Sequence, residues 1–166
     1  MTDDATMTAG TATMMKRNAA TASRIGRWAR SAGAVLGGML ASAALALGTD
    51  ELLHLIGLFP PIDQVTYDAP RFVAATSYRV IYAILGFYLI ARLAPSHPWR
   101  HVWVAAAMGL IASMAGVVAT MTRDMGPLWY PVALAVTTLP CAWLGGALRG
   151  AAGLRLRSAR REGPEP

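Results

Sequence analysis

The segment LGTDELLHLIGLFPP, residues 47–61, carries three ionisable side chains inside an otherwise apolar stretch. These are Asp50, Glu51 and His54. On a helix, adjacent residues and residues four apart fall within an arc of about 100°, so we expect the three side chains on one polar face. Carboxylate and imidazole groups can accept and donate protons, and they can also bind an ion or a polar headgroup.

A fourth charge, Arg79, lies in the next apolar stretch, FVAATSYRVIYAILGFYLIARL, together with Tyr78 and Tyr82. A charge inside a membrane span is costly alone and usually finds a partner within the protein. We therefore expect Arg79 to pair with Asp50 or Glu51, with both tyrosines and the histidine close by. The predicted polar cluster consists of Asp50, Glu51, His54, Arg79 and Tyr82.

Three interpretations of this cluster are open. It can be a structural ion pair that fixes the register of the first two helices. It can be a site for a small molecule, an ion or a lipid headgroup, open to the outer face of a membrane. Alternatively, its side chains extend independently to the headgroup layer.

Other familiar chemistries lack the residues that they need. The single Cys141 permits neither a disulfide nor a paired-cysteine redox site within one chain. His54 is expected on the outer side of a membrane, whereas His97 and His101 are expected on the inner side, about one membrane thickness away. The sequence shows no glycine-rich phosphate loop, zinc spacing or nucleophile elbow. It therefore predicts no cofactor, no metal site and no catalytic residues.

The elements that must position the cluster follow from the composition. The chain has 166 residues, of which 55% are hydrophobic and 14% are charged, which is too few charges for the surface of a soluble domain. Four apolar stretches of about 20 residues are long enough for spanning helices: residues 32–59, 72–93, 102–122 and 128–148. The predicted fold is an all-α integral membrane four-helix bundle. We expect residues 1–30 to form a disordered basic tail and residues 150–166 to form a basic C-terminal tail.

The distribution of Lys and Arg predicts the orientation. Twelve of the 15 basic residues lie before residue 31, in the second connection or after residue 148. Cytoplasmic flanks retain such residues, so both termini are expected in the cytoplasm and the chain in the inner membrane of a bacterium. Anionic headgroups at the cytoplasmic face account for the net charge of +6 without nucleic acid. The first span also has the form of a cleavable leader, although we favour an uncleaved anchor.

Small residues recur every four positions in the first and third spans. Gly38, Ser42 and Ala46 follow one such spacing, as do Ala105, Gly109 and Ser113, and this pattern predicts that the first and third helices pack centrally. Residues 38–49 and 109–120 also align without gaps. The alignment indicates either two hairpins in a parallel repeat or a chance match between alanine-rich segments.

The sequence resembles a widespread group of small four-span bacterial inner-membrane proteins without an assigned activity. The resemblance rests on TDELLHLIGLFPP, on YRVIYAILGFYLIARLAPSHPWRH, on GPLWYP and on LPCAWLGG, and it covers residues 47–149. It implies four spans, an inner-membrane location and a set of recurring polar and aromatic positions: Thr49, Asp50, His54, Tyr78, Arg79, Arg92, Trp129, Tyr130 and Pro131.

Three classes of function follow. The favoured one is a non-enzymatic membrane protein that acts by packing with itself, as a homo-oligomer, or with a membrane partner. The second is an oligomeric small transporter or channel with an outer-face polar site. The third is a membrane enzyme that uses Asp50, Glu51 and His54 as acid and base groups.

Overall fold

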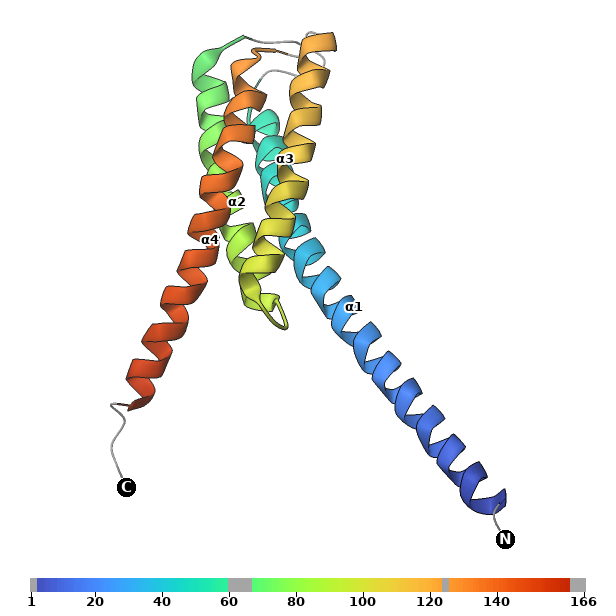
Figure 1. Ribbon diagram of the computed structural model, residues 1–166. Coiled ribbons are helices and arrows are strands. Elements are labelled where there is room, and N and C mark those ends of the chain that lie inside the picture. Colours follow the sequence, from blue (N-terminus) through green and yellow to red (C-terminus); the bar gives the residue numbers. More distant parts are fainter. Residues whose placement is uncertain (1–2, 60–66, 124–125, 162–166) are drawn as a thin grey trace.

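The computed structural model of the chain describes residues 3–59, 67–123 and 126–161. Four α-helices make up most of them: α1 (Asp3–Leu55), α2 (Ala69–Leu93), α3 (Pro98–Arg123) and α4 (Trp129–Arg161). The helices run alternately up and down, and the first part of α1 and the last part of α4 extend from the same end of the bundle (Figure 1). The described residues contain no strand, so the predicted all-α four-helix fold is confirmed.

Each helix contains a segment that is long and apolar enough to cross a membrane. These segments are Thr21–Leu55, Ala69–Leu93, Pro98–Arg123 and Trp129–Gly153. The shortest have 25 residues, or about 38 Å at ~1.5 Å per residue, which exceeds a hydrocarbon core of ~30 Å. The chain is therefore a multi-pass membrane protein.

The helices are longer at the chain ends than the sequence indicated. The disordered tail predicted for residues 1–30 is helical from Asp3 onward, because this alanine-rich stretch contains no proline that would stop a helix. The tail predicted for residues 150–166 continues α4 as far as Arg161. By contrast, α1 ends at Leu55 rather than at residue 59, because Gly57 adopts a left-handed φ of 75° that closes the helix end.

The most extensive helix contact joins α2 to α4, while α1 packs on α2 and α3 packs on α4. Helix α1 meets α3 over only a few residues and does not contact α4 within the described residues. The prediction that the first and third helices lie at the centre is therefore wrong. The two hairpins also pack unequally, since α2 contacts α3 but α1 does not contact α4 in the described part, so the parallel repeat stays a prediction.

Glycines explain why α2 is central. A Cβ atom added to Gly38 of α1 would lie 2.7 Å from the Gly86 carbonyl oxygen of α2, and one added to Gly145 of α4 would lie 2.7 Å from the Ile84 carbonyl oxygen. The absence of a side chain thus lets both helices approach the α2 main chain, as small residues do between membrane helices. By contrast, Gly33 and Gly37 have nothing within 4 Å of such an atom and face away from the bundle.

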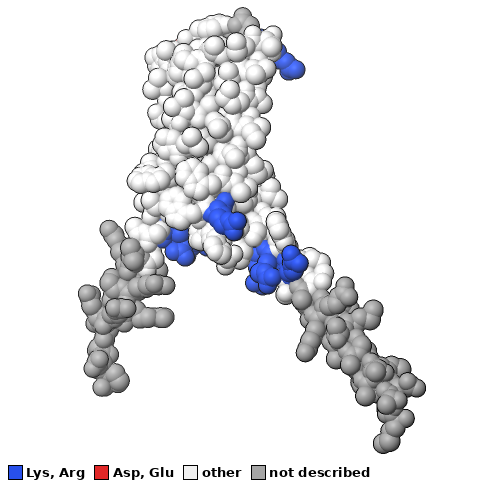
Figure 2. Space-filling view, in the orientation of Figure 1, with Lys and Arg blue, Asp and Glu red and all other residues white. Residues whose placement is uncertain are grey.

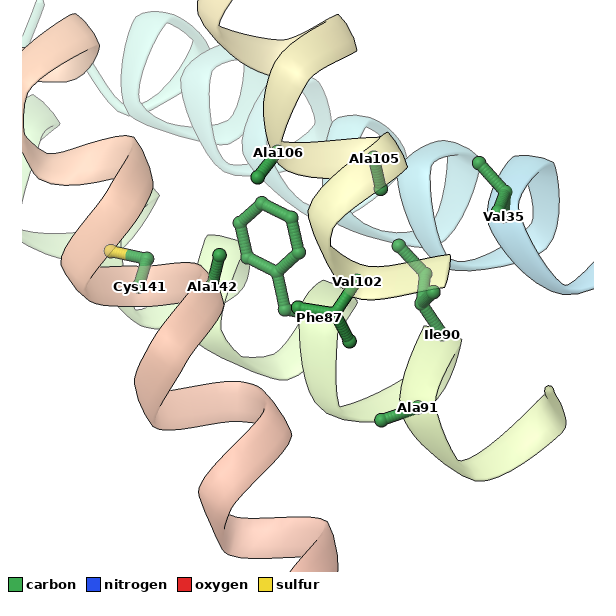
Figure 3. Packing of buried hydrophobic residues seen from close by; sticks show 9 residues of the cluster. All are labelled: Val35, Phe87, Ile90, Ala91, Val102, Ala105, Ala106, Cys141 and Ala142. Carbon is green, nitrogen blue, oxygen red and sulfur yellow. The ribbon is translucent and has the colours of Figure 1, made fainter. Parts of the chain in front are cut away.

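The hydrophobic core lies where α2, α3 and α4 meet. Figure 3 shows the Phe87 ring between Ala106 of α3 and Ala142 of α4. Ile90 of α2 and Val102 of α3 are the largest fully buried side chains. The core is built mainly from small residues, so the helices are close together at this level.

Arginines gather at one end of the bundle, which we call the basic end. It carries Arg24, Arg27, Arg30, Arg92, Arg100 and Arg149. Figure 2 shows basic side chains grouped at the level where the bundle ends and α1 and α4 diverge. Asp50, Glu51 and Asp68 lie toward the opposite end, which we call the acidic end.

Candidate functional site

An ion pair joins α1 to α2 toward the acidic end of the bundle. The Arg79 guanidinium donates a hydrogen bond to one carboxylate oxygen of Asp50. The Arg79 side chain is 28% exposed and that of Asp50 is 19% exposed. Arg79 lies ten residues after Ala69, or about 15 Å along α2, and is therefore close to the middle of this helix. A charge at this position needs a counter-charge, and the structure supplies the one predicted partner, Asp50, and not Glu51.

Two tyrosines complete the surroundings of the pair. The Tyr78 hydroxyl donates a hydrogen bond to the other carboxylate oxygen of Asp50. The Arg79 Cζ atom also lies 5.6 Å from the centre of the Tyr130 ring, within the range of a cation–π contact. Phe72 packs against Tyr130 with 4.9 Å between ring centres. Helices α1, α2 and α4 therefore all contribute to the site.

The neighbouring polar side chains bond to the α1 main chain and, in one case, to each other. The Thr49 hydroxyl donates to the Leu45 carbonyl oxygen at 2.8 Å, so its contact of 3.0 Å with the Tyr82 hydroxyl has Tyr82 as the donor. The His54 Nδ1 atom lies 2.7 Å from the Asp50 carbonyl oxygen, one turn earlier in the same helix. Only the Thr49–Tyr82 bond joins α1 to α2, while the other two bonds lie within α1.

The structure thus brings together four of the five predicted cluster residues and separates the fifth. Asp50 and Arg79 are in direct contact, and Tyr82 and His54 are their neighbours through Thr49 and the α1 main chain. Glu51 is exposed, and the ion pair with Arg79 is made by Asp50 instead. The three ionisable residues of α1 therefore do not form a joint acid–base set: the Asp50 carboxylate bonds to α2, and His54 bonds to a main-chain oxygen.

A cavity of about 490 Å³ lies beside the pair, between all four helices. It extends along α1 from Gly38 to Ala46, which is about 12 Å at ~1.5 Å per residue. Its wall consists of small and apolar residues, and Arg79 is the only charged one among its described lining residues. The Arg79 Nε atom is covered by protein and has no hydrogen-bond partner within the described residues.

The cavity exists because α1 and α3 are separated. Both helices line it with small side chains, among them Ser42 and Ala46 of α1 and Gly109 and Gly116 of α3. These two helices meet over only a few residues, so space remains between them at the level of the cavity. The small-residue pattern that predicted close packing of the two helices instead leaves space between them.

Sequence reasoning missed Tyr130 and the cavity. Tyr130 opens α4 and is distant from Arg79 in sequence, so only the resemblance to a protein group marked it as a recurring position. Among the described residues, no group of three or more His, Cys, Asp or Glu side chains could hold a metal ion.

Comparisons with protein families, with curated proteins and with solved structures find no match for this chain.

Proposed function

We propose that this protein is a non-enzymatic binding protein of the bacterial inner membrane that holds a small apolar molecule in the cavity beside Arg79. The observation that carries the proposal is the cavity of about 490 Å³, lined by all four helices and by a single charge. Ligand sites in proteins have volumes of roughly 300–1,000 Å³, mostly apolar walls and few polar groups, and this cavity fits that description.

The chemistry of the pair favours binding over catalysis. The Asp50 carboxylate accepts hydrogen bonds from Tyr78 and Arg79, so its two oxygens are engaged and it is a poor general base. Cys141 is buried in the core rather than in the cavity wall. The favoured class from the sequence, a protein that packs with itself or with a membrane partner, is likewise non-enzymatic, although it does not include a small-molecule ligand.

The polar part of the ligand follows from the charge balance. Asp50 neutralises Arg79, so a second anion at this place would leave an uncompensated negative charge in an apolar setting. The Nε–H group of Arg79 has no described acceptor, and a buried donor without one costs about 1–3 kcal/mol. Arg79 also lines the cavity and is the one charged donor among its described lining residues. The ligand that fits best is therefore a neutral apolar chain with one carbonyl or hydroxyl oxygen.

The binding proposal is tested by ligand-induced stabilisation. The purified protein in detergent receives 2-dodecanone, dodecane or dodecanoate at equal concentrations, and its thermal unfolding is recorded. A ligand at 100 times its Kd stabilises the folded state by about 2.7 kcal/mol, so we expect a clear rise of Tm with the ketone and smaller rises with the other two. A Tm that no probe alters would contradict the proposal.

A matched pair of variants locates the effect. Ala112 and Ala115 are both exposed on α3, but only Ala112 lines the cavity. The change Ala112→Phe narrows the cavity and should abolish the ketone effect, whereas Ala115→Phe should leave it unchanged. An equal rise of Tm with the ketone in both variants would show that the ketone binds outside the cavity, in the detergent layer around the helices.

The orientation within this proposal rests on charge. The basic end carries six of the described arginines, and both α1 and α4 extend from it toward the chain termini, so we place this end in the cytoplasm. A cysteine introduced by Tyr67→Cys at the acidic end should react with an impermeant thiol reagent on intact cells, whereas Ser96→Cys should not. Cys141 is only 2% exposed, so the parent protein is the unlabelled control. If only the Ser96→Cys variant were labelled, the basic end would lie outside the cell and the proposed orientation would be wrong.

A further inference from the structure

A second hollow lies at the basic end, between α1 and α3, and is separate from the cavity beside Arg79. Its volume is about 390 Å³. Its apolar walls are formed by Val35 and Leu36 of α1 and by Val104 and Met108 of α3. We call this hollow the α1/α3 groove. Val35 is buried and belongs to the same hydrophobic core cluster as Ala105.

Cationic and aromatic side chains surround the mouth of the α1/α3 groove. Arg100, His101 and Trp28 are among the residues that line it. Arg24 precedes Trp28 by four residues in α1 and is exposed, so it lies on the same helix face one turn farther out. An apolar slot with arginine and tryptophan at its mouth has the layout of a chain and a headgroup, because these side chains favour the headgroup layer of a membrane.

We propose that the α1/α3 groove binds an anionic phospholipid, with one acyl chain between the two helices and its phosphate at Arg100 and Arg24. The walls offer an acyl chain apolar contact on two sides, which a flat helix surface does not. Guanidinium groups bind phosphate oxygens through paired, charge-assisted hydrogen bonds. Basic pockets between membrane helices bind the headgroups of anionic lipids in this way.

A second copy of this chain is a poorer occupant of the groove. Copies inserted in the same orientation would bring their own basic ends to this level, and arginine would then face arginine. Trp28 and Leu36, which are 73% and 52% exposed, also keep a partner helix from close approach at this place. A flexible acyl chain can pass between such side chains, whereas a rigid helix cannot.

The proposal is tested by lipid retention in native mass spectrometry of the full chain. Phosphatidylglycerol or phosphatidylcholine with identical acyl chains is added to the protein in mixed micelles, and bound lipid is counted. The parent should retain one phosphatidylglycerol in preference to phosphatidylcholine. Arg100→Gln should weaken this binding by about fivefold, the effect of one basic residue at a membrane surface. Arg92→Gln removes an exposed arginine from the same end but outside the groove, and it should leave binding unchanged.

A second pair of variants tests the acyl-chain part. Val104 and Val118 are 55% and 57% exposed on the same helix, and only Val104 lines the groove. Val104→Trp should fill the groove and abolish retention, while Val118→Trp should retain the lipid. Equal retention of the two lipids by the parent, or equal losses in Arg100→Gln and Arg92→Gln, would overturn the proposal and indicate unspecific lipid around the bundle. If Val104→Trp does not fold, the arginine pair alone decides.

Discussion

Exchanging both members of the Asp50–Arg79 pair for leucine should cost clearly less stability than the two single exchanges added together. Removing one partner of a buried ion pair costs ~3–5 kcal/mol, because the other charge is left without compensation. The two side chains here are 28% and 19% exposed, which places Arg79→Leu near the lower limit, at about 3 kcal/mol. Asp50→Leu should cost about 2 kcal/mol, since Arg79 then keeps the Tyr130 ring.

The double variant measures the coupling free energy between Asp50 and Arg79. With both charges gone, the remaining loss is the Tyr78 hydroxyl without its acceptor and some imperfect packing, together about 2 kcal/mol. The single changes amount to about 5 kcal/mol, so the coupling between the two residues is about 3 kcal/mol. The measurement is the free energy of unfolding in bicelles for the parent, both single variants and the double variant.

A surface pair supplies the control for this cycle. Arg71 and Asp68 are joined at 3.1 Å near the start of α2, with side chains that are 41% and 38% exposed. Exposed pairs contribute at most about 1 kcal/mol, so Arg71→Leu should have a small effect. A double variant of Asp50 and Arg79 that loses the full sum of the single changes would refute the reasoning, because the two charges would then act independently.

Three other outcomes follow from the packing and the contacts. Gly145→Ala should destabilise the protein by about 1–3 kcal/mol because the new methyl group meets the α2 main chain, whereas Gly150→Ala, with nothing within 4 Å, should be neutral or slightly stabilising in a thermal melt. Tyr130→Phe should preserve the ring contact with Arg79, and Tyr130→Leu should lower the free energy of unfolding by about 1 kcal/mol. Cys141, which is 2% exposed, should react with a thiol reagent only at the rate of unfolding, as followed by mass spectrometry in increasing denaturant.

The sequence was sufficient to predict the four spans and the ion pair, because both depend on strong local signals. Apolar length alone identifies a spanning helix, and a charge such as Arg79 inside one requires a partner at a similar depth. The choice of Asp50 over Glu51 depends on which face of α1 meets α2. That choice was open in the sequence, because the two acids are adjacent and lie about 100° apart on the helix.

Which helices pack against each other could not be predicted from the sequence. Small residues indicate that a second helix can approach closely, but they do not show which helix it is. Gly38 does approach another helix, but the approached residue is Gly86 of α2 rather than a residue of α3. Gly109 of α3, on an equally regular small-residue spacing, lines the cavity instead. Which of these outcomes a glycine has depends on the bulk of the side chains opposite, and that is set by the tertiary arrangement.

The attachment of α1 to α2 makes the space between α1 and α3 sensitive to the thickness of the surrounding bilayer. Helix α1 is joined to α2 both at the Gly38–Gly86 approach and at the Asp50–Arg79 pair, whereas it has few contacts with α3 and none with α4 in the described part. A spanning helix adapts to a thinner or thicker hydrocarbon layer by changing its tilt. Because α1 is fixed to α2 at two levels, a change of tilt would move α1 and α2 together relative to α3, so the width of the space between α1 and α3 would vary with membrane thickness.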